Sequence, residues 1–92
     1  MKPLGLSESF RARVRAYPRE TRGKIGLALQ HLERDFGQPH RHQSLGIRKL
    51  TGNFFEIRAG LDIRLVFQNR VECLLFVMAG NHDEVQKFLR GL

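Results

Sequence analysis

The sequence has little cysteine and no long apolar run, and each shortage excludes a class of protein. The single cysteine, Cys73, cannot form an intramolecular disulfide, and its place in an apolar stretch favours a buried small hydrophobe over a reactive thiol. No apolar run approaches the ~18 residues of a membrane span, and the start MKPLGLSESF lacks the apolar core of a signal peptide. We therefore expect a cytoplasmic protein with no membrane partner.

Sequence motifs for common cofactors are also missing. The chain contains neither the GxGxxG motif of dinucleotide-binding folds nor the GxxxxGK[ST] phosphate loop. No serine or cysteine stands in a recognisable nucleophile turn. His31, His40 and His42 lack a nearby cysteine or carboxylate that would complete a metal site, so a solvated loop or a loop beside a phosphate is favoured. We expect no metal and no small-molecule cofactor.

Acidic residues are few compared with basic ones. The chain has 16 lysines and arginines against 9 aspartates and glutamates, a formal charge of +7, and most of the basic residues are arginine. Arginine matches a phosphate with two parallel hydrogen bonds and keeps its charge when half buried. A polyanion is therefore the expected partner class, with nucleic acid favoured over a membrane surface. The alternative is a basic surface without a specific ligand.

The first part of the chain carries apolar side chains at helical spacing. One helix is predicted between a cap at Ser7 or Ser9 and Pro18, with its apolar stripe at Leu6, Phe10, Val14 and Tyr17. A second, longer helix has its stripe at Ile25, Ala28, Leu29, Leu32 and Phe36. Residues 2–6 are a candidate for a short first strand, and residues 37–45 are a predicted loop.

Residues 47–81 predict short strands joined by tight turns. On both sides of Gly60 the odd positions are apolar, and a one-residue slip would move every side chain to the other face. A three-residue loop at 59–61, with Gly60 left-handed, sets Glu56 opposite Arg64. This register places four charged side chains on one polar face: Glu56, Arg58, Asp62 and Arg64.

The other strands and the last helix follow from similar patterns. A strand is expected at 47–50, and a turn at 68–70 would pair Phe67 with Val71. Residues 73–79 are apolar at both parities, which suits an interior strand. Asn81 and Glu84 form a capping box for a C-terminal helix. We predict one α+β domain over residues 1–92, with an antiparallel sheet of about four strands packed on an N-terminal two-helix hairpin and a short C-terminal helix.

The basic strand face is where we expect chemistry. Metal-free cleavage of an RNA phosphodiester needs a general base, a general acid and positive groups beside the phosphate oxygens. Arg58 and Arg64 suit the third role, and Arg48 or Lys49 on a neighbouring strand can support it. His82 stands at a helix N-terminus, where the helix dipole favours the neutral imidazole and hence a proton acceptor.

Each of these assignments has a structural alternative. Glu56 is the other candidate base, but Glu56 with Arg64, and Arg58 with Asp62, also describe an ordinary salt-bridge ladder across two strands. His82 is alternatively a first-turn residue without a special role, and Lys49 a solvated one. Phe54 is a candidate for stacking on an RNA base, although partly buried aromatics are common on sheets.

Two helices, a loop, the stretch KLTGNFFEIRAGLDIRLVF and an apolar strand ending near a histidine together resemble the RelE/ParE superfamily of bacterial toxin–antitoxin toxins, RelE-like branch. The resemblance covers essentially the whole chain. Its most specific parts are Lys49-Leu50, Gly52, Glu56-Ile57-Arg58, Asp62-Ile63-Arg64 and the ending GNHDEV. It implies a microbial-ribonuclease-like fold, a ribosome-dependent endonuclease that cuts mRNA without metal and so inhibits translation, and a cognate antitoxin that covers the site.

By this resemblance Arg58 and Arg64 act on the phosphate, Lys49 belongs to the basic strand before the turn, and His82 is the terminal basic residue. The spacing from Arg58 to Arg64 is one residue longer than in many members. The tyrosine that many RelE-type toxins carry near the C-terminus is also missing. Two alternatives follow: the ParE branch, which has the same fold but inhibits DNA gyrase, and a degenerate member that binds its antitoxin without cutting RNA.

Overall fold

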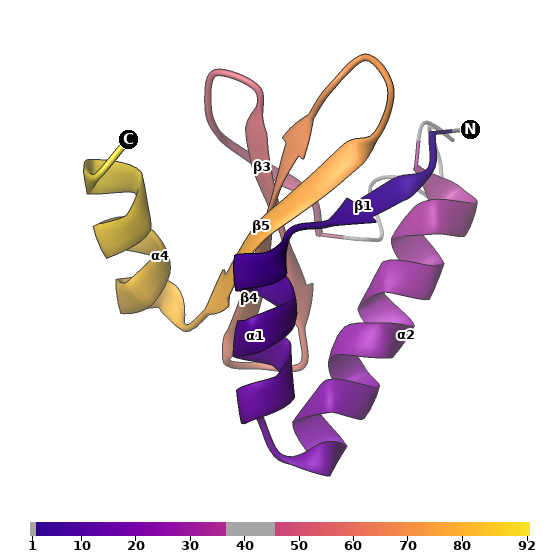
Figure 1. The fold of residues 1–92 in the computed structure, drawn as a ribbon, viewed down its shortest axis with the longest axis vertical. Helices are drawn as coiled ribbons and strands as arrows, with labels where there is room; N and C mark the ends of the chain where they lie inside the picture. Colours follow the sequence, from indigo (N-terminus) through magenta and orange to yellow (C-terminus); the bar gives the residue numbers. More distant parts are fainter. Residues whose placement is uncertain (1, 37–45) are drawn as a thin grey trace.

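A five-stranded sheet separates two layers of helix in the computed structural model, which describes residues 2–36 and 46–92 (Figure 1). The predicted loop at 37–45, with His40 and His42, lies outside the described residues. The elements along the chain are β1 (Leu4–Leu6), α1 (Glu8–Ala16), α2 (Arg19–Asp35), β2 (Arg48–Thr51), β3 (Phe54–Ala59), β4 (Ile63–Asn69), β5 (Leu74–Gly80) and α4 (His82–Arg90).

The helices begin and end where the sequence predicts. The Ser7 hydroxyl accepts a hydrogen bond from the Phe10 backbone N–H at 3.1 Å and so caps α1. Pro18, which cannot donate a backbone hydrogen bond, stands just before α2. The predicted stripes face the sheet, because Phe10, Ile25 and Leu32 are buried and the other stripe residues pack against them. No helix of the described residues is both long and apolar enough to cross a membrane.

The sheet is mixed, and this corrects the prediction of an antiparallel sheet of about four strands. The strand order is β1-β5-β4-β3-β2, and β1 pairs with β5 in parallel while the other pairs are antiparallel. The interior position predicted for the apolar strand is confirmed, since β5 lies between β1 and β4. The chain reaches β5 only after every other strand, so local patterns could not indicate the pairing with β1.

The turn between β3 and β4 is displaced by one residue from the predicted one, which shifts the pairing of the two strands by two residues. Ala59 pairs with Ile63, so the loop is 60–62 instead of 59–61, and Gly60 takes the left-handed conformation (φ 73°) at its first position. Ala59 stays in the strand because its side chain is buried in the core. A shift of two residues keeps every side chain on its predicted face but makes Arg58, instead of Glu56, the direct partner of Arg64.

The predicted pairing of Phe67 with Val71 is wrong. Phe67 pairs with Phe76, and the strands end at the Asn69–Leu74 pair, so the connecting turn is longer than predicted. Val71 lies in this turn with 93% of its surface exposed. The longer turn is favoured because it brings the rings of Phe67 and Phe76 together in the core, with centroids 5.1 Å apart.

The two faces of the sheet carry separate cores. Leu65 and Phe67 pack against α1 and α2, whereas Val66 between them packs with Met78 and Val85 under α4. Figure 1 shows α4 and the α1–α2 pair on opposite sides of the sheet. The contacts of α4 with the sheet are mainly with β4 and β5, and Leu50 of β2 and Phe54 of β3 pack at the margin of the same core.

Candidate functional site

Arg64 and His82 line one open cleft of about 490 Å³ beside the N-terminus of α4. The remaining lining residues are Leu61, Asp62, Asn81 and Asp83. The pairing of β4 with β5 explains the meeting, since Arg64 is the partner of Gly80, after which the chain turns into α4. The structure therefore brings together two candidate residues that are far apart in the sequence.

Arg58 and Arg48 extend this site along the sheet. Arg58 is the antiparallel partner of Arg64, so the two side chains leave the same face about 5 Å apart at their Cβ atoms. Arg48 of the edge strand is the partner of Glu56 and therefore shares that face. Arg58 is exposed, and its side chain makes no hydrogen bond or ion pair with the described residues. Its charge is thus available to a ligand.

Glu56 lies almost completely buried on the same face. Its carboxylate is 3.7 Å from an Arg64 Nη1 nitrogen, and the two side chains are 6% and 17% exposed. The predicted ion pair between Glu56 and Arg64 thus forms, although the two residues are diagonal neighbours on β3 and β4 and not direct strand partners. Burial makes the carboxylate a poor candidate for contact with a substrate but a good one for orienting the Arg64 guanidinium.

Two of the candidate RNA-binding residues lie away from the cleft. Lys49 pairs with Phe55, whose side chain packs into the core under α1 and α2. The Lys49 side chain therefore leaves the edge strand on the opposite face from Arg58. Phe54 is on the arginine face, but its ring packs edge-on against Phe88 of α4 with centroids 6.3 Å apart. Phe54 remains half-buried, so only part of its ring is available to a ligand.

The capping box predicted at α4 is present and sets the position of His82. The Asn81 side chain accepts from the Glu84 N–H, and a Glu84 carboxylate oxygen accepts from the Asn81 N–H, both at 2.8 Å. Gly80 is required just before it, since a Cβ there would lie 2.9 Å from the Glu84 Cβ. His82 is thereby the first residue of α4, exposed at the mouth of the cleft.

Sequence reasoning missed Arg13, which ties α1 to this end of the sheet. Its Nε donates to the Ala79 carbonyl, and its Nη2 donates to Glu84 at 2.8 Å. Tyr17 lies beside the same pair, and burial, with a smaller effect of the Glu84 charge, raises its pKa. The chain's only tyrosine therefore stands near the start of α4, but it comes from the helical hairpin and does not line the cleft.

We expect Glu84 to make the protein less stable in acid. The pKa of Glu84 lies below its ordinary value of 4.5, first because the Asn81 N–H donates to the carboxylate and then because of Arg13. A lowered folded-state pKa means that the stabilisation is present above about pH 4.5 and is lost as pH falls through the folded value. Urea unfolding should therefore show Glu84→Gln less stable than the parent at about pH 6, with the difference shrinking as the pH falls below about 4.5. A difference independent of pH would contradict this assignment.

The cleft offers the guanidinium group of Arg64 and the imidazole of His82, and Arg58 lies beside Arg64 on the sheet. Among the described residues, no group of three or more His, Cys, Asp or Glu side chains could hold a metal ion. The carboxylates of Asp62 and Asp83, both exposed, also line the cleft and offset part of its positive charge. An anionic group that avoids these carboxylates would meet Arg58 and Arg64 with His82 beside it.

No protein-family model and no curated protein sequence matches this chain. Solved structures do match it. The RelB–RelE antitoxin–toxin complex from Methanococcus jannaschii gives a TM-score of 0.70 at 15% identity, covering 91% of this chain and 96% of that one. YafQ from E. coli gives 0.69 at 14% identity over 92% and 98%, and HP0894 from Helicobacter pylori gives 0.60 at 20% over 92% and 99%. The chain thus has a RelE-like toxin fold, which confirms the fold class predicted from sequence.

Proposed function

We propose that this chain, with its RelE-like toxin fold, is the toxin of a type II toxin–antitoxin system and cuts mRNA on the ribosome. The observation that carries the proposal is that Arg64 and His82 line one cleft and that Arg58 is the strand partner of Arg64 on the same face of the sheet. Two guanidinium groups and one imidazole can stabilise a phosphate and move a proton, which cleavage of an RNA phosphodiester requires.

In the proposed reaction the 2′-oxygen of a ribose attacks the neighbouring phosphorus and the bond to the 5′-oxygen breaks. One proton leaves the attacking hydroxyl and one reaches the leaving oxygen, giving a 2′,3′-cyclic phosphate and a 5′-hydroxyl. His82 is the proton-transfer group. Arg58 and Arg64 bind the non-bridging oxygens as negative charge builds on them. Glu56 holds Arg64 in place.

The other candidate residues are proposed to bind RNA without entering the reaction. Arg48 continues the line of arginines onto the edge strand and suits a further phosphate. The free part of the Phe54 ring is available for stacking on a base. Lys49, on the other face of β2, would contact the ribosome or a more distant part of the RNA.

A cognate antitoxin completes the proposal. The RelE-like neighbour from Methanococcus jannaschii was solved in a RelB–RelE antitoxin–toxin complex. By analogy, an antitoxin would bind this chain and cover the cleft, so that the arginines cannot reach RNA. Such a partner should be acidic, because it must compete with a polyanion for the same cations.

The test is to induce the chain in a bacterial host, follow growth and map mRNA 5′ ends. New cuts in reading frame that disappear when translation is blocked are expected. Growth arrest without new cuts would contradict the nuclease and favour a ParE-like inhibitor of DNA gyrase, which filamentation and DNA-damage signalling would identify. Harmless accumulation of folded protein would contradict both activities and indicate a degenerate member.

A further inference from the structure

The last residues of β5 have no neighbouring strand on the side of β1. The parallel pairing of the two strands ends with Leu6 and Phe76, whereas β5 continues to Gly80. An unpaired strand edge leaves backbone carbonyls that need hydrogen-bond donors. Side chains of α1 supply them, beginning with the Ser9 hydroxyl, which donates to the Val77 carbonyl at 3.4 Å. The helix thus takes the place of a strand along this part of β5.

Arg13 of α1 makes the next contact along this edge and a second contact beyond it. Its Nε donates to the Ala79 carbonyl, and its Nη2 donates to a carboxylate oxygen of Glu84 at 2.8 Å. These two acceptors stand on either side of the junction between β5 and α4. Because a guanidinium presents its donors in one rigid plane, a single side chain fixes the two ends of the junction relative to each other.

His82 lies between the two residues that Arg13 holds. It is the first residue of α4 and follows the cap at Asn81. The Oε2 oxygen of Glu84 accepts from Arg13, and the Oε1 oxygen accepts from the Asn81 N–H. Arg13 is therefore linked through one carboxylate to the cap that fixes the start of α4.

Open space flanks the Arg13–Glu84 pair on both sides. One hollow, of about 270 Å³, is bordered by the pair and Tyr17, and another, of about 420 Å³, is bordered by the pair and Lys87. The core under α1 and the core under α4 are also separate clusters of residues. Within the described part of the chain, the pair therefore connects the two helices at a place where their cores do not.

We propose that Arg13 is a positioning residue for RNA cleavage: it holds the start of α4 so that the His82 imidazole reaches the scissile phosphate. This inference rests on the proposed function. Arg13 does not line the cleft, so it acts through Ala79 and Glu84. A displacement of about 1 Å at a reacting group can slow a reaction about 10²-fold. The side chains of the pair are 36% and 45% exposed, so the pair adds little to stability.

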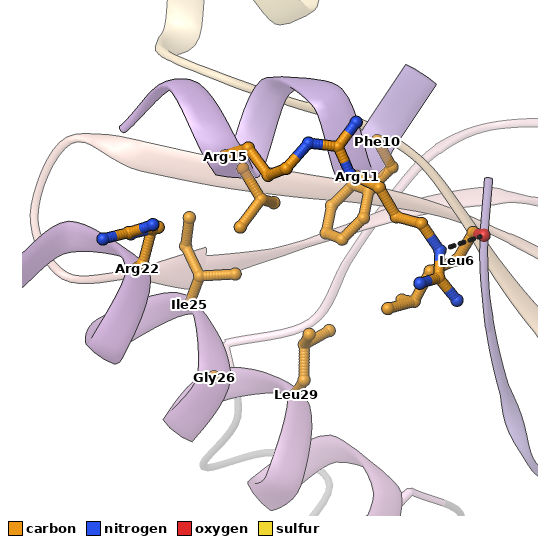
Figure 2. A pocket seen from close by; sticks show the side chains of 9 residues that line it. Leu6, Phe10, Arg11, Arg15, Arg22, Ile25, Gly26 and Leu29 are labelled. Atoms are coloured by element: carbon orange, nitrogen blue, oxygen red, sulfur yellow. Dashed lines mark hydrogen bonds between the residues drawn. The ribbon is translucent and has the colours of Figure 1, made fainter. Parts of the chain in front are cut away.

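Arg11 provides a matched control on the same helix. Figure 2 shows its side chain running back to Leu6, where its Nε donates to the backbone carbonyl at 3.3 Å. It shares with Arg13 its charge, its helix and a hydrogen bond to a strand carbonyl, but that bond stays within neighbouring residues of the chain. Removing either arginine lowers the electrostatic attraction to RNA by one charge. The two substitutions therefore differ in what they do to α4.

The first test measures the rate at which the protein, in excess, cuts a short mRNA on purified ribosomes. Arg13→Ala should lower the maximal rate about 10–100-fold, while its half-saturating concentration equals that of Arg11→Ala. Arg11→Ala should keep the maximal rate of the parent within about twofold. An unchanged maximal rate in Arg13→Ala, with only a higher half-saturating concentration, would show that Arg13 merely attracts RNA and would overturn the proposal.

The second test observes the start of α4 directly and needs no activity. In NMR spectra of the isotope-labelled protein, Arg13→Ala should shift the amide signals of residues 79–84 and lower their order parameters from about 0.85 towards about 0.6. The signals of β3 and the thermal melting of the whole protein should change little, and Arg11→Ala should leave residues 79–84 as in the parent. Unchanged order at residues 79–84 in Arg13→Ala, or loss of order throughout the sheet, would contradict a positioning role.

A double variant tests whether Arg13 acts through Glu84. In Glu84→Gln the new side chain can still accept from the Asn81 N–H, as in other capping boxes, but it offers Arg13 no negative charge. Arg13→Ala combined with Glu84→Gln should therefore cut no more than about twofold more slowly than Arg13→Ala alone. Losses that multiply would mean that the two residues act independently, and the proposed link would be rejected.

The outcomes separate this inference from the proposed function. A parent protein that cuts no mRNA would reject the proposed function, and the NMR comparison would still decide whether Arg13 holds the start of α4. Cleavage by the parent that is unchanged in Arg13→Ala would reject the positioning role and leave the proposed function intact.

Discussion

Arg58→Ala protein is expected to fold like the parent and to cut mRNA about 10²–10³-fold more slowly, the cost of removing one positioned donor from a developing charge. Folding should be unaffected because Arg58 is exposed and its side chain makes no hydrogen bond or ion pair with the described residues. Surface substitutions of this kind usually change the free energy of unfolding by less than about 0.5 kcal/mol. Mapping of mRNA 5′ ends measures the first effect and urea unfolding the second.

The matched control for Arg58→Ala is Arg19→Ala. Arg19 is also exposed, and its substitution removes the same charge from the first residue of α2, outside the cleft. Cleavage by the Arg19→Ala protein should equal that of the parent. An equal loss in both variants would indicate that net charge, and not the site, governs activity. Full cleavage by well-folded Arg58→Ala protein would remove Arg58 from the site.

Arg64→Ala is expected to cost both activity and stability. The substitution leaves the carboxylate of Glu56, 6% exposed, without the cation 3.7 Å away. Removing one partner of a buried ion pair is strongly destabilising, and for this incompletely buried pair we expect about 2–3 kcal/mol in the free energy of unfolding. Urea unfolding at neutral pH measures the loss directly.

A second substitution separates the two effects of Arg64→Ala. Glu56→Gln added to Arg64→Ala removes the unpaired buried charge and should recover more than half of the lost stability, while cleavage stays low. A double variant as unstable as Arg64→Ala alone would contradict the predicted recovery of stability. Recovered cleavage in the double variant would show that Arg64 acts on folding and not on the phosphate.

Local patterns in the sequence predicted much of the site. The alternation of apolar and polar residues through β3 and β4 placed Arg58 and Arg64 on one face. This placement survived an error of two residues in the pairing of the strands, because an even shift preserves the face. The spacing of Asn81 and Glu84 predicted the start of α4 and with it the position of His82. These features depend on neighbours in the chain, so the sequence alone specifies them.

Contacts between distant segments were decided only in the tertiary structure. Three features join residues that are far apart in the sequence, and periodic patterns among neighbouring residues could not predict them. They are the parallel pairing of β1 with β5, the two hydrogen bonds from Arg13 to the Ala79 carbonyl and to Glu84, and the cleft shared by Arg64 and His82. Sequence by itself determined which side chains share a strand face or a helix stripe; packing of those faces against one another decided which residues meet, because burial of the apolar core selects one arrangement of the elements.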